Sequence, residues 1–184
     1  MVLYSVAMRY EFGVGHWLQR HPLLYAITHM AITPLMALYV ASFAHADAPL
    51  SARIWPVIAL ATCATVAYEL GRKTWAPEQE HADADSYSRL WGTTGAGLAV
   101  LVAIAAATAA SVHVCRALQL AWATDLVIGA TGLAAAATAV WFMRQPTARA
   151  AKLLGLLTSL LLLVDLSAVA IAVAIDRGLT WGPA

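Results

Sequence analysis

Residues 93–112 read TTGAGLAVLVAIAAATAASV and contain no charged side chain. A transmembrane helix needs about 20 consecutive, mainly apolar residues, and this stretch meets that requirement. The rest of the chain has the same character, because 61% of its 184 residues are hydrophobic and 11% are charged. Soluble domains carry roughly 25% charged residues. The composition therefore excludes an ordinary water-soluble domain and a disordered chain, and it predicts an integral membrane protein.

Four other stretches are apolar and long enough to be interpreted as membrane spans. Together with the first stretch they predict an all-α fold, a polytopic transmembrane helix bundle with five full spans. The predicted spans cover residues 22–44, 54–70, 93–112, 118–142 and 153–175. A short N-terminal apolar helix is also expected, since residues 1–10 are apolar but too few to cross a bilayer. Residues 1–184 are thus interpreted as a single transmembrane domain.

Basic residues are distributed unequally between the two sides of the predicted bundle. The side of the connector 71–92 carries Arg9, Arg20, Arg72, Lys73, Arg89, Arg144, Arg149 and Lys152. The other side carries Arg53, Arg116 and Arg177. Cytoplasmic loops of membrane proteins are enriched in Lys and Arg, so we predict that the connector is cytoplasmic and that the C-terminus is outside. The net charge is only +1, without a clustered basic excess, which excludes a nucleic-acid binder.

The connector 71–92 and the helix end before it concentrate charged groups. Glu69, Arg72 and Lys73 occur at i, i+3 and i+4, so they share one helical face at the membrane surface. Four carboxylates follow within eight residues: Glu78, Glu80, Asp83 and Asp85. Carboxylates suit Mg²⁺, and an adjacent Arg and Lys suit a phosphate group. The segment is interpreted as half of a diphosphate–Mg²⁺ site; the alternative is a solvated loop beside an ordinary helix pair.

Two segments resemble the UbiA-type intramembrane prenyltransferases. Residues 68–92, YELGRKTWAPEQEHADADSYSRLWG, resemble the second acidic motif of this family, in which a Glu, a basic pair and spaced acidic residues enter a cytoplasmic loop. Residues 9–39, RYEFGVGHWLQRHPLLYAITHMAITPLMALY, resemble the portion of bacterial members that leads into their fifth helix. The resemblance implies the C-terminal half of a nine-helix fold, helices five to nine, in a prokaryotic inner (plasma) membrane.

The resemblance implies a function and a role for each charged residue. Family members hold Mg²⁺ around an isoprenyl diphosphate and transfer its prenyl group to a lipophilic acceptor. By position, the metal ligands would be Glu78, Glu80, Asp83 and Asp85. Arg72 and Lys73 would bind the diphosphate, and Glu69 would orient these two cations as the third catalytic residue.

The sequence departs from the family pattern in two respects. The carboxylates are spaced E-x-E-x-x-D-x-D and include no D-x-x-x-D pair. The first acidic motif of the family, an Asn followed by spaced aspartates, has no counterpart here. The resemblance therefore implies that transfer requires an N-terminal half, which either precedes this sequence in a longer protein or is supplied by a partner chain.

His29, Asp125 and Asp165 are ionisable residues that lie well inside predicted spans. Counted from the span ends, Asp125 lies about 10 Å from one surface and Asp165 about 18 Å from the other. In a hydrocarbon core of about 30 Å these depths nearly coincide. We expect the two carboxyls to share a proton, or each to bond a nearby hydroxyl or carbonyl, with at least one protonated. His29 is interpreted as a hydrogen-bonded packing residue.

Two other functions remain open for this sequence, a non-catalytic membrane subunit and a small transporter that uses the buried carboxylates. A transporter places its charged groups near the middle of the membrane. The densest charge cluster here lies at the predicted cytoplasmic surface instead. This position favours the prenyltransferase-like interpretation.

Overall fold

The computed structural model describes residues 2–19, 21–44, 54–81 and 86–177, and these residues form helices and connecting loops without any strand. The all-α class predicted from the sequence is confirmed. In chain order the elements are α1 (Val2–Arg9), η1 (Glu11–Gly13), α2 (Gly15–Gln19), α3 (Pro22–Met30), α4 (Ile32–Ala44), α5 (Trp55–Arg72), η2 (Pro77–Gln79), α6 (Tyr87–Ala117), α7 (Trp122–Arg144) and α8 (Ala148–Arg177).

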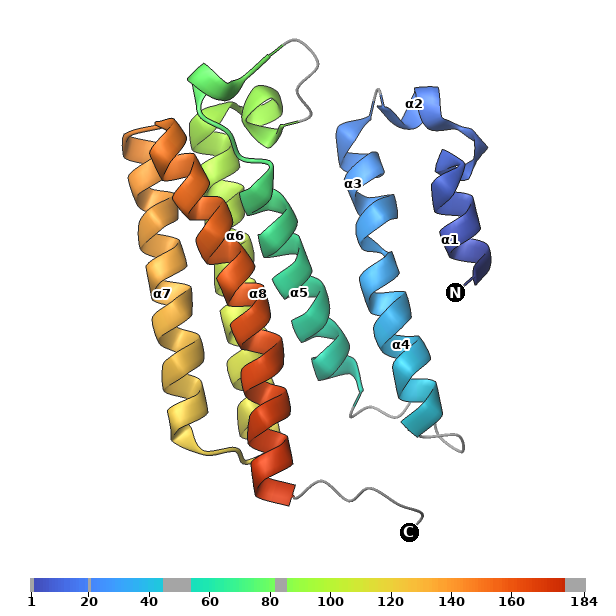
Figure 1. Ribbon diagram of the computed structural model, residues 1–184, viewed down its shortest axis with the longest axis vertical. Helices are drawn as coiled ribbons and strands as arrows, with labels where there is room; N and C mark the ends of the chain where they lie inside the picture. Colours follow the sequence, from blue (N-terminus) through green and yellow to red (C-terminus); the bar gives the residue numbers. More distant parts are fainter. Residues whose placement is uncertain (1, 20, 45–53, 82–85, 178–184) are drawn as a thin grey trace.

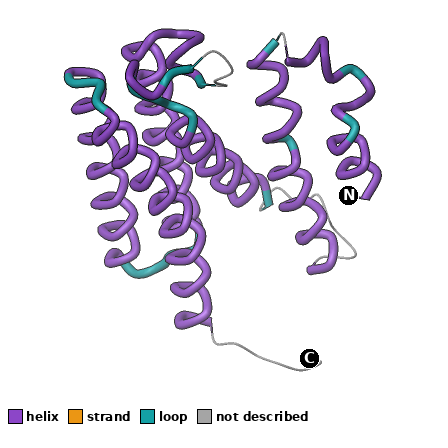
Figure 2. The backbone as a smooth tube through the Cα atoms, turned by 45° about the horizontal axis from the view of Figure 1, so that its top comes forward, coloured by secondary structure: helices purple, strands orange, loops and turns teal. Residues whose placement is uncertain are grey.

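Helices α5 to α8 form a four-helix bundle in which α5 packs against both α6 and α8 (Figure 1). The residues between the helices are mostly small, and Ala64, Ala107, Ala135 and Ala139 have no exposed surface. Small residues let helix backbones approach closely where lipid provides no hydrophobic driving force. The α3–α4 pair lies along the other side of α5, with α1 and α2 beyond it (Figure 2).

Among the described residues, three helices, α6, α7 and α8, are long and apolar enough to cross a membrane, in agreement with the predicted membrane protein. The other two predicted spans have a different form. The span expected at 22–44 is divided at Ala31 into α3 and α4. Pro34 explains this break, because a proline has no N–H to donate to the carbonyl four residues earlier, that of Met30. Helix α5 has 18 residues and carries Glu69 in its last turns, which makes its composition more polar.

Helix α6 begins earlier than the sequence analysis expected, at Tyr87 rather than residue 93. Gly92 interrupts it with φ 70° and ψ 167°, a conformation that glycine adopts without a steric penalty. Ser86 caps the first turn by accepting a hydrogen bond from the Arg89 amide at 3.1 Å. The last part of the predicted connector is therefore a short helix, and the long apolar part of α6 begins after Gly92.

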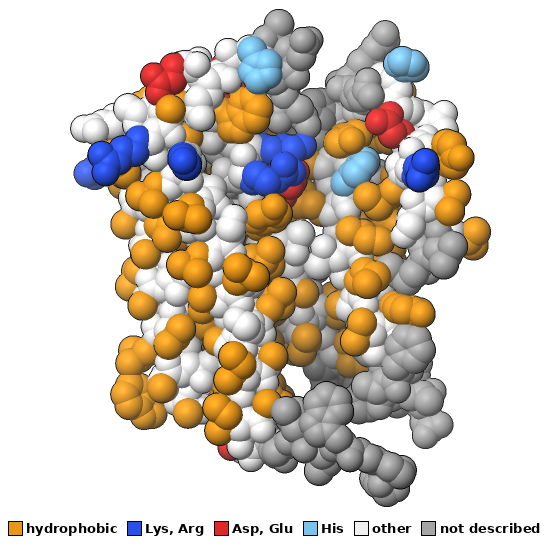
Figure 3. All heavy atoms as spheres, in the orientation of Figure 1, with side chains coloured by type: hydrophobic (Ala, Val, Ile, Leu, Met, Phe, Trp, Pro, Cys, Tyr) orange, Lys and Arg blue, Asp and Glu red, His pale blue; other side chains and the backbone are white. Residues whose placement is uncertain are grey.

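Most basic side chains of the described residues form a band at one end of the molecule, above an apolar surface (Figure 3). The last residue of α5, Arg72, the last residue of α7, Arg144, and the first turn of α8 with Arg149 all lie at this end (Figure 1). We call it the basic end. Large apolar side chains such as Leu133 and Leu163 point outward below it.

The close contact between α6 and α7 at Gly132 generates a stability prediction. A methyl group added to Gly132 would lie 2.4 Å from Thr108 Oγ1 and 3.3 Å from Thr108 Cβ. Thr108 is β-branched, so rotation of its side chain cannot relieve this steric clash. We expect Gly132→Ala to lower the free energy of unfolding by about 1–3 kcal/mol. Gly129→Ala on the same helix, where a methyl group meets nothing within 4 Å, is the control. Unfolding in detergent micelles measures both, and equal stability of the two variants would contradict the predicted contact.

Candidate functional site

The chain that leaves α5 folds back over the basic end through hydrogen bonds to α6. The Tyr87 amide donates to the Lys73 carbonyl at 2.9 Å, and the Trp75 amide donates to Ser88 Oγ at 2.8 Å. The Trp75 indole donates to the Arg72 carbonyl at 3.2 Å, which satisfies one of the free carbonyls at the end of α5. These bonds fix the backbone on both sides of Arg72 and Lys73.

Glu69, Arg72 and Lys73 lie together on one face of α5. Arg72 Nη2 is 2.6 Å from Glu69 Oε2, and Lys73 Nζ is 3.3 Å from Glu69 Oε1. The hydrogen bond and the negative charge of Glu69 raise the pKa of the Arg72 guanidinium, while partial burial opposes this increase. One carboxylate therefore holds two permanent cations next to each other, with Arg72 half exposed and Lys73 more buried.

Two cavities open on either side of these cations, and both are lined by Tyr68 and Arg72. The smaller cavity measures about 290 Å³ and lies between α3 and α5, where Glu69, Lys73 and His29 contribute to its wall. The larger cavity measures about 850 Å³ and lies between α5, the loop after it and α8. Arg72 thus separates two spaces at the basic end.

His29 lines the smaller cavity and contacts Tyr25. Its Nδ1 lies 2.9 Å from the Tyr25 carbonyl, and its ring stacks on the Tyr25 ring at a centroid distance of 4.0 Å. Tyr25 in turn lies 5.9 Å from Lys73 Nζ, a cation–π distance that links α3 to α5.

Glu78 has a role that the sequence analysis did not identify. Its Oε1 accepts a hydrogen bond from the amide of Ala148, the first residue of α8, at 2.6 Å. The first amides of a helix have no partner within the helix, and the positive end of its dipole favours a carboxylate. Glu78 therefore ties the loop after α5 to α8. No sequence pattern could have indicated this contact, because the two residues are 70 positions apart.

The other predicted metal ligands are only partly described. Glu80 Oε1 accepts a hydrogen bond from Ser86 Oγ at 2.5 Å, and its Oε2 is buried without a hydrogen-bond partner in the described residues. Asp83 and Asp85 lie outside the described residues. Within the described ranges, no group of three or more His, Cys, Asp or Glu residues could hold a metal ion. The described residues therefore bring together too few ligands to form an Mg²⁺ site.

Asp125 and Asp165 have different surroundings in the bundle. Helix α7 begins at Trp122 and not at residue 118, because Gln119 has a φ of 56° in the turn before it. Asp125 therefore lies in the first turn of α7, nearer the helix end than the sequence count placed it, with Oδ2 3.9 Å from Arg116 Nε. Asp165 is fully buried, and neither of its oxygens makes a hydrogen bond of ordinary geometry within the described residues.

Comparison of the chain with models of protein families, with curated proteins and with solved structures finds no match to any of them. These comparisons do not test the resemblance to the UbiA-type enzymes, which stays a prediction. The cations, cavities and carboxylates of the basic end are therefore the features that indicate a function.

The bond between Glu78 and α8 predicts a structural effect of substitution that does not depend on metal. We expect Glu78→Ala to lower the free energy of unfolding by about 1 kcal/mol, the usual value of a helix cap. Glu78→Gln retains an acceptor oxygen and should lose less. Thermal unfolding in detergent, with Mg²⁺ and with a chelator, measures both, and Asp176→Ala is an exposed control. A loss that appears only with Mg²⁺ would instead assign Glu78 to a metal.

Proposed function

We propose that the chain is the C-terminal half of a prenyltransferase-like membrane protein and binds an isoprenyl diphosphate at the basic end. The observation that carries the proposal is the arrangement of Arg72 and Lys73, held side by side by Glu69 next to two cavities. The apolar surface below the basic end would receive the prenyl chain, and a lipophilic acceptor would reach the site from the membrane.

The chemistry of these cations supports diphosphate binding. A guanidinium presents a fork of donors that matches phosphate oxygens, and an ammonium adds a compact positive charge. Prenyl transfer breaks the bond between carbon and the diphosphate oxygen, so negative charge accumulates on the departing diphosphate. Cations held in place before the reaction stabilise that charge without reorganisation. Arg72 and Lys73 would act in this way, and Glu69 would keep them in position.

A complete transfer site requires more than the described residues. Mg²⁺ demands near-octahedral oxygen coordination. Glu80 Oε2 is the one buried carboxylate oxygen without a hydrogen-bond partner among the described residues of the segment 78–85. The proposal assigns the remaining ligands to Asp83, Asp85 and an N-terminal half. We therefore expect this chain alone to bind a diphosphate weakly and to transfer no prenyl group.

The proposal includes five membrane spans. The α3–α4 pair would act as one span broken at Ala31, and α5 as a shorter span, in addition to α6, α7 and α8. The connector 71–92 would be cytoplasmic and the C-terminus outside, in a prokaryotic inner membrane. What supports this orientation is the band of basic side chains at the end where α5 and α7 finish (Figure 3).

One observation favours a small transporter as a second candidate function. Asp165 is fully buried in α8 without a hydrogen-bond partner in the described residues. Ionisable residues within membrane spans are costly and often mark ion or proton pathways. The cavities and most cations lie at the basic end rather than beside Asp165, which leaves the prenyltransferase-like function as the better supported of the two.

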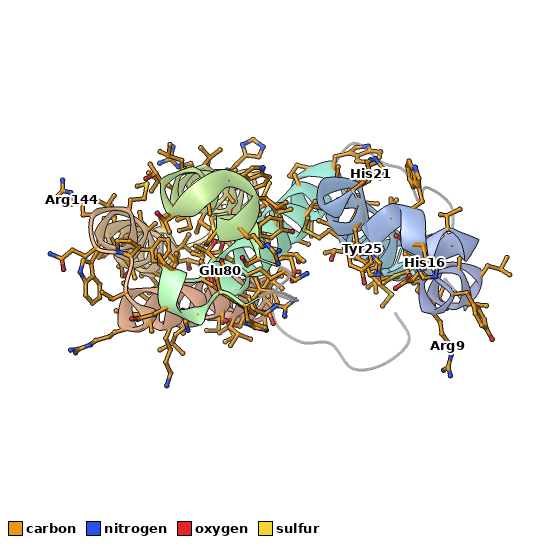
Figure 4. All side chains as sticks on the ribbon, turned by 90° about the horizontal axis from the view of Figure 1, so that it is seen from above. Arg9, His16, His21, Tyr25, Glu80 and Arg144 are labelled. Atoms are coloured by element: carbon orange, nitrogen blue, oxygen red, sulfur yellow. The ribbon has the colours of Figure 1, made fainter. Side chains whose placement is uncertain are left out.

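The proposed diphosphate site is tested by binding. The purified chain in lipid nanodiscs is titrated calorimetrically with farnesyl thiodiphosphate, a non-reactive isoprenyl diphosphate analogue. Arg72→Gln/Lys73→Gln should weaken binding at least tenfold, because a hydrogen bond to a charged group contributes about 1.5–3 kcal/mol. The control is Arg144→Gln, at the basic end but pointing away from the bundle (Figure 4). Equal weakening by control and double variant, or no binding by the natural chain, would overturn the proposal.

The same titration tests the role of the carboxylates. Removal of Mg²⁺ should weaken binding by the natural chain, while Glu80→Gln/Asp83→Asn should bind the analogue equally with and without Mg²⁺. If both proteins respond equally to Mg²⁺, the metal does not bind in the segment 78–85.

The proposed orientation is tested by cysteine accessibility. Both natural cysteines, Cys63 and Cys115, are first replaced by serine. Single cysteines are then introduced at two exposed positions, Gln79 at the basic end and Gln119 in the turn before α7. In intact cells an impermeant maleimide should label position 119 and leave position 79 unlabelled until the membrane is opened. Labelling of position 79 from outside would reverse the orientation.

A further inference from the structure

The larger cavity has a different chemical character from the smaller one. Its basic lining residues are Arg72 at the end of α5 and Arg149 and Lys152 in the first turns of α8. No Asp or Glu is among its lining residues, whereas Glu69 lines the smaller cavity. A space with several cations and no carboxylate suits an anion that is bound without a metal ion.

Arg149 and Lys152 are available for such an anion. Both side chains are exposed, and neither makes an ion pair with another described residue. They lie one turn apart on α8, so they face the same direction. The bond from the Ala148 amide to Glu78 holds the loop that carries Trp75 and Gln79 against the start of α8. Trp75 and Gln79 line the same cavity opposite the two cations.

The polarity of the cavity changes along α8. Below Lys152 its wall continues with Leu153, Leu156 and Ser159. Leu156 is 62% exposed and belongs to the apolar part of the surface. From Arg149 to Ser159 the wall extends about 15 Å along the helix, at 1.5 Å per residue. A ligand that fills it has a charged head at the basic end and an apolar chain directed into the membrane.

We propose that this cavity binds the phosphate head of an anionic membrane lipid, with Arg149 and Lys152 as its main contacts and the lipid chain against Leu153 and Leu156. Its volume of about 850 Å³ lies within the usual range for ligand cavities, roughly 300–1,000 Å³. In the proposed orientation the basic band would lie at the level of the lipid phosphates, because Lys and Arg gather at the cytoplasmic membrane surface. This site needs neither Mg²⁺ nor prenyl transfer, and so it goes beyond the proposed function.

The experiment is native mass spectrometry of the full chain in detergent, titrated with phosphatidylglycerol in the presence of a chelator. Arg149→Gln/Lys152→Gln should lower the affinity at least tenfold. The control, Arg9→Gln/Arg144→Gln, removes the same charge from two side chains that point away from the bundle (Figure 4), and it should bind like the natural chain. Thermal unfolding of both double variants verifies that they are folded.

Two further arms identify the head and the chain of the ligand. Glycerol phosphate, which has the head without the chain, should bind at least tenfold more weakly than phosphatidylglycerol. Displacement of the phospholipid by farnesyl thiodiphosphate, with loss of that binding in Arg149→Gln/Lys152→Gln, would place the diphosphate of the proposed function in this cavity and would overturn the assignment to a membrane phospholipid. Unchanged phospholipid affinity in that variant, or equal binding of glycerol phosphate, would overturn the proposal. Neither result depends on Arg72→Gln/Lys73→Gln, which tests the proposed function separately.

Discussion

Close contact between helices at small residues is the constraint on which the rest of this structure depends. A methyl group on Gly71 would lie 2.2 Å from Thr158 Oγ1, so α5 and α8 approach at a point where only a hydrogen atom fits. Helices α6 and α7 approach equally closely at two glycines, Gly97 against Met143 and Gly132 against Thr108. In lipid, helices associate through such packing, because the surrounding hydrocarbon is as apolar as their side chains.

The contact at Gly71 also positions the basic end. It brings the end of α5 to the side of α8, close to the first turns where Arg149 and Lys152 lie. The loop after α5 then covers both helices, since Trp75 bonds to Arg72 and Ser88, and Glu78 bonds to the first amide of α8. The larger cavity is the space that remains below this loop, and its cations come from two helices far apart in the sequence.

The structure gives Glu69 and Glu78 different roles within the charged segment 69–85. Glu69 holds two cations together through both of its oxygens, and Glu78 caps a helix through its Oε1. The buried Oε2 of Glu80 remains without a partner among the described residues. The basic groups are therefore the better supported part of the candidate site, and a metal would depend on Asp83 and Asp85, which lie outside the described residues.

The sequence alone determined the features that follow from local composition and spacing. The apolar runs predicted α6, α7 and α8, and the spacing of Glu69, Arg72 and Lys73 predicted a shared helical face, because both properties depend on residues within a few turns of each other. Only the tertiary structure decided that Glu78 caps α8, that Asp125 lies beside Arg116, and that Arg149 and Lys152 face the cavity beside Arg72. These arrangements join residues from different helices, whose relative positions are set by packing at contacts such as Gly71–Thr158 and not by any local pattern.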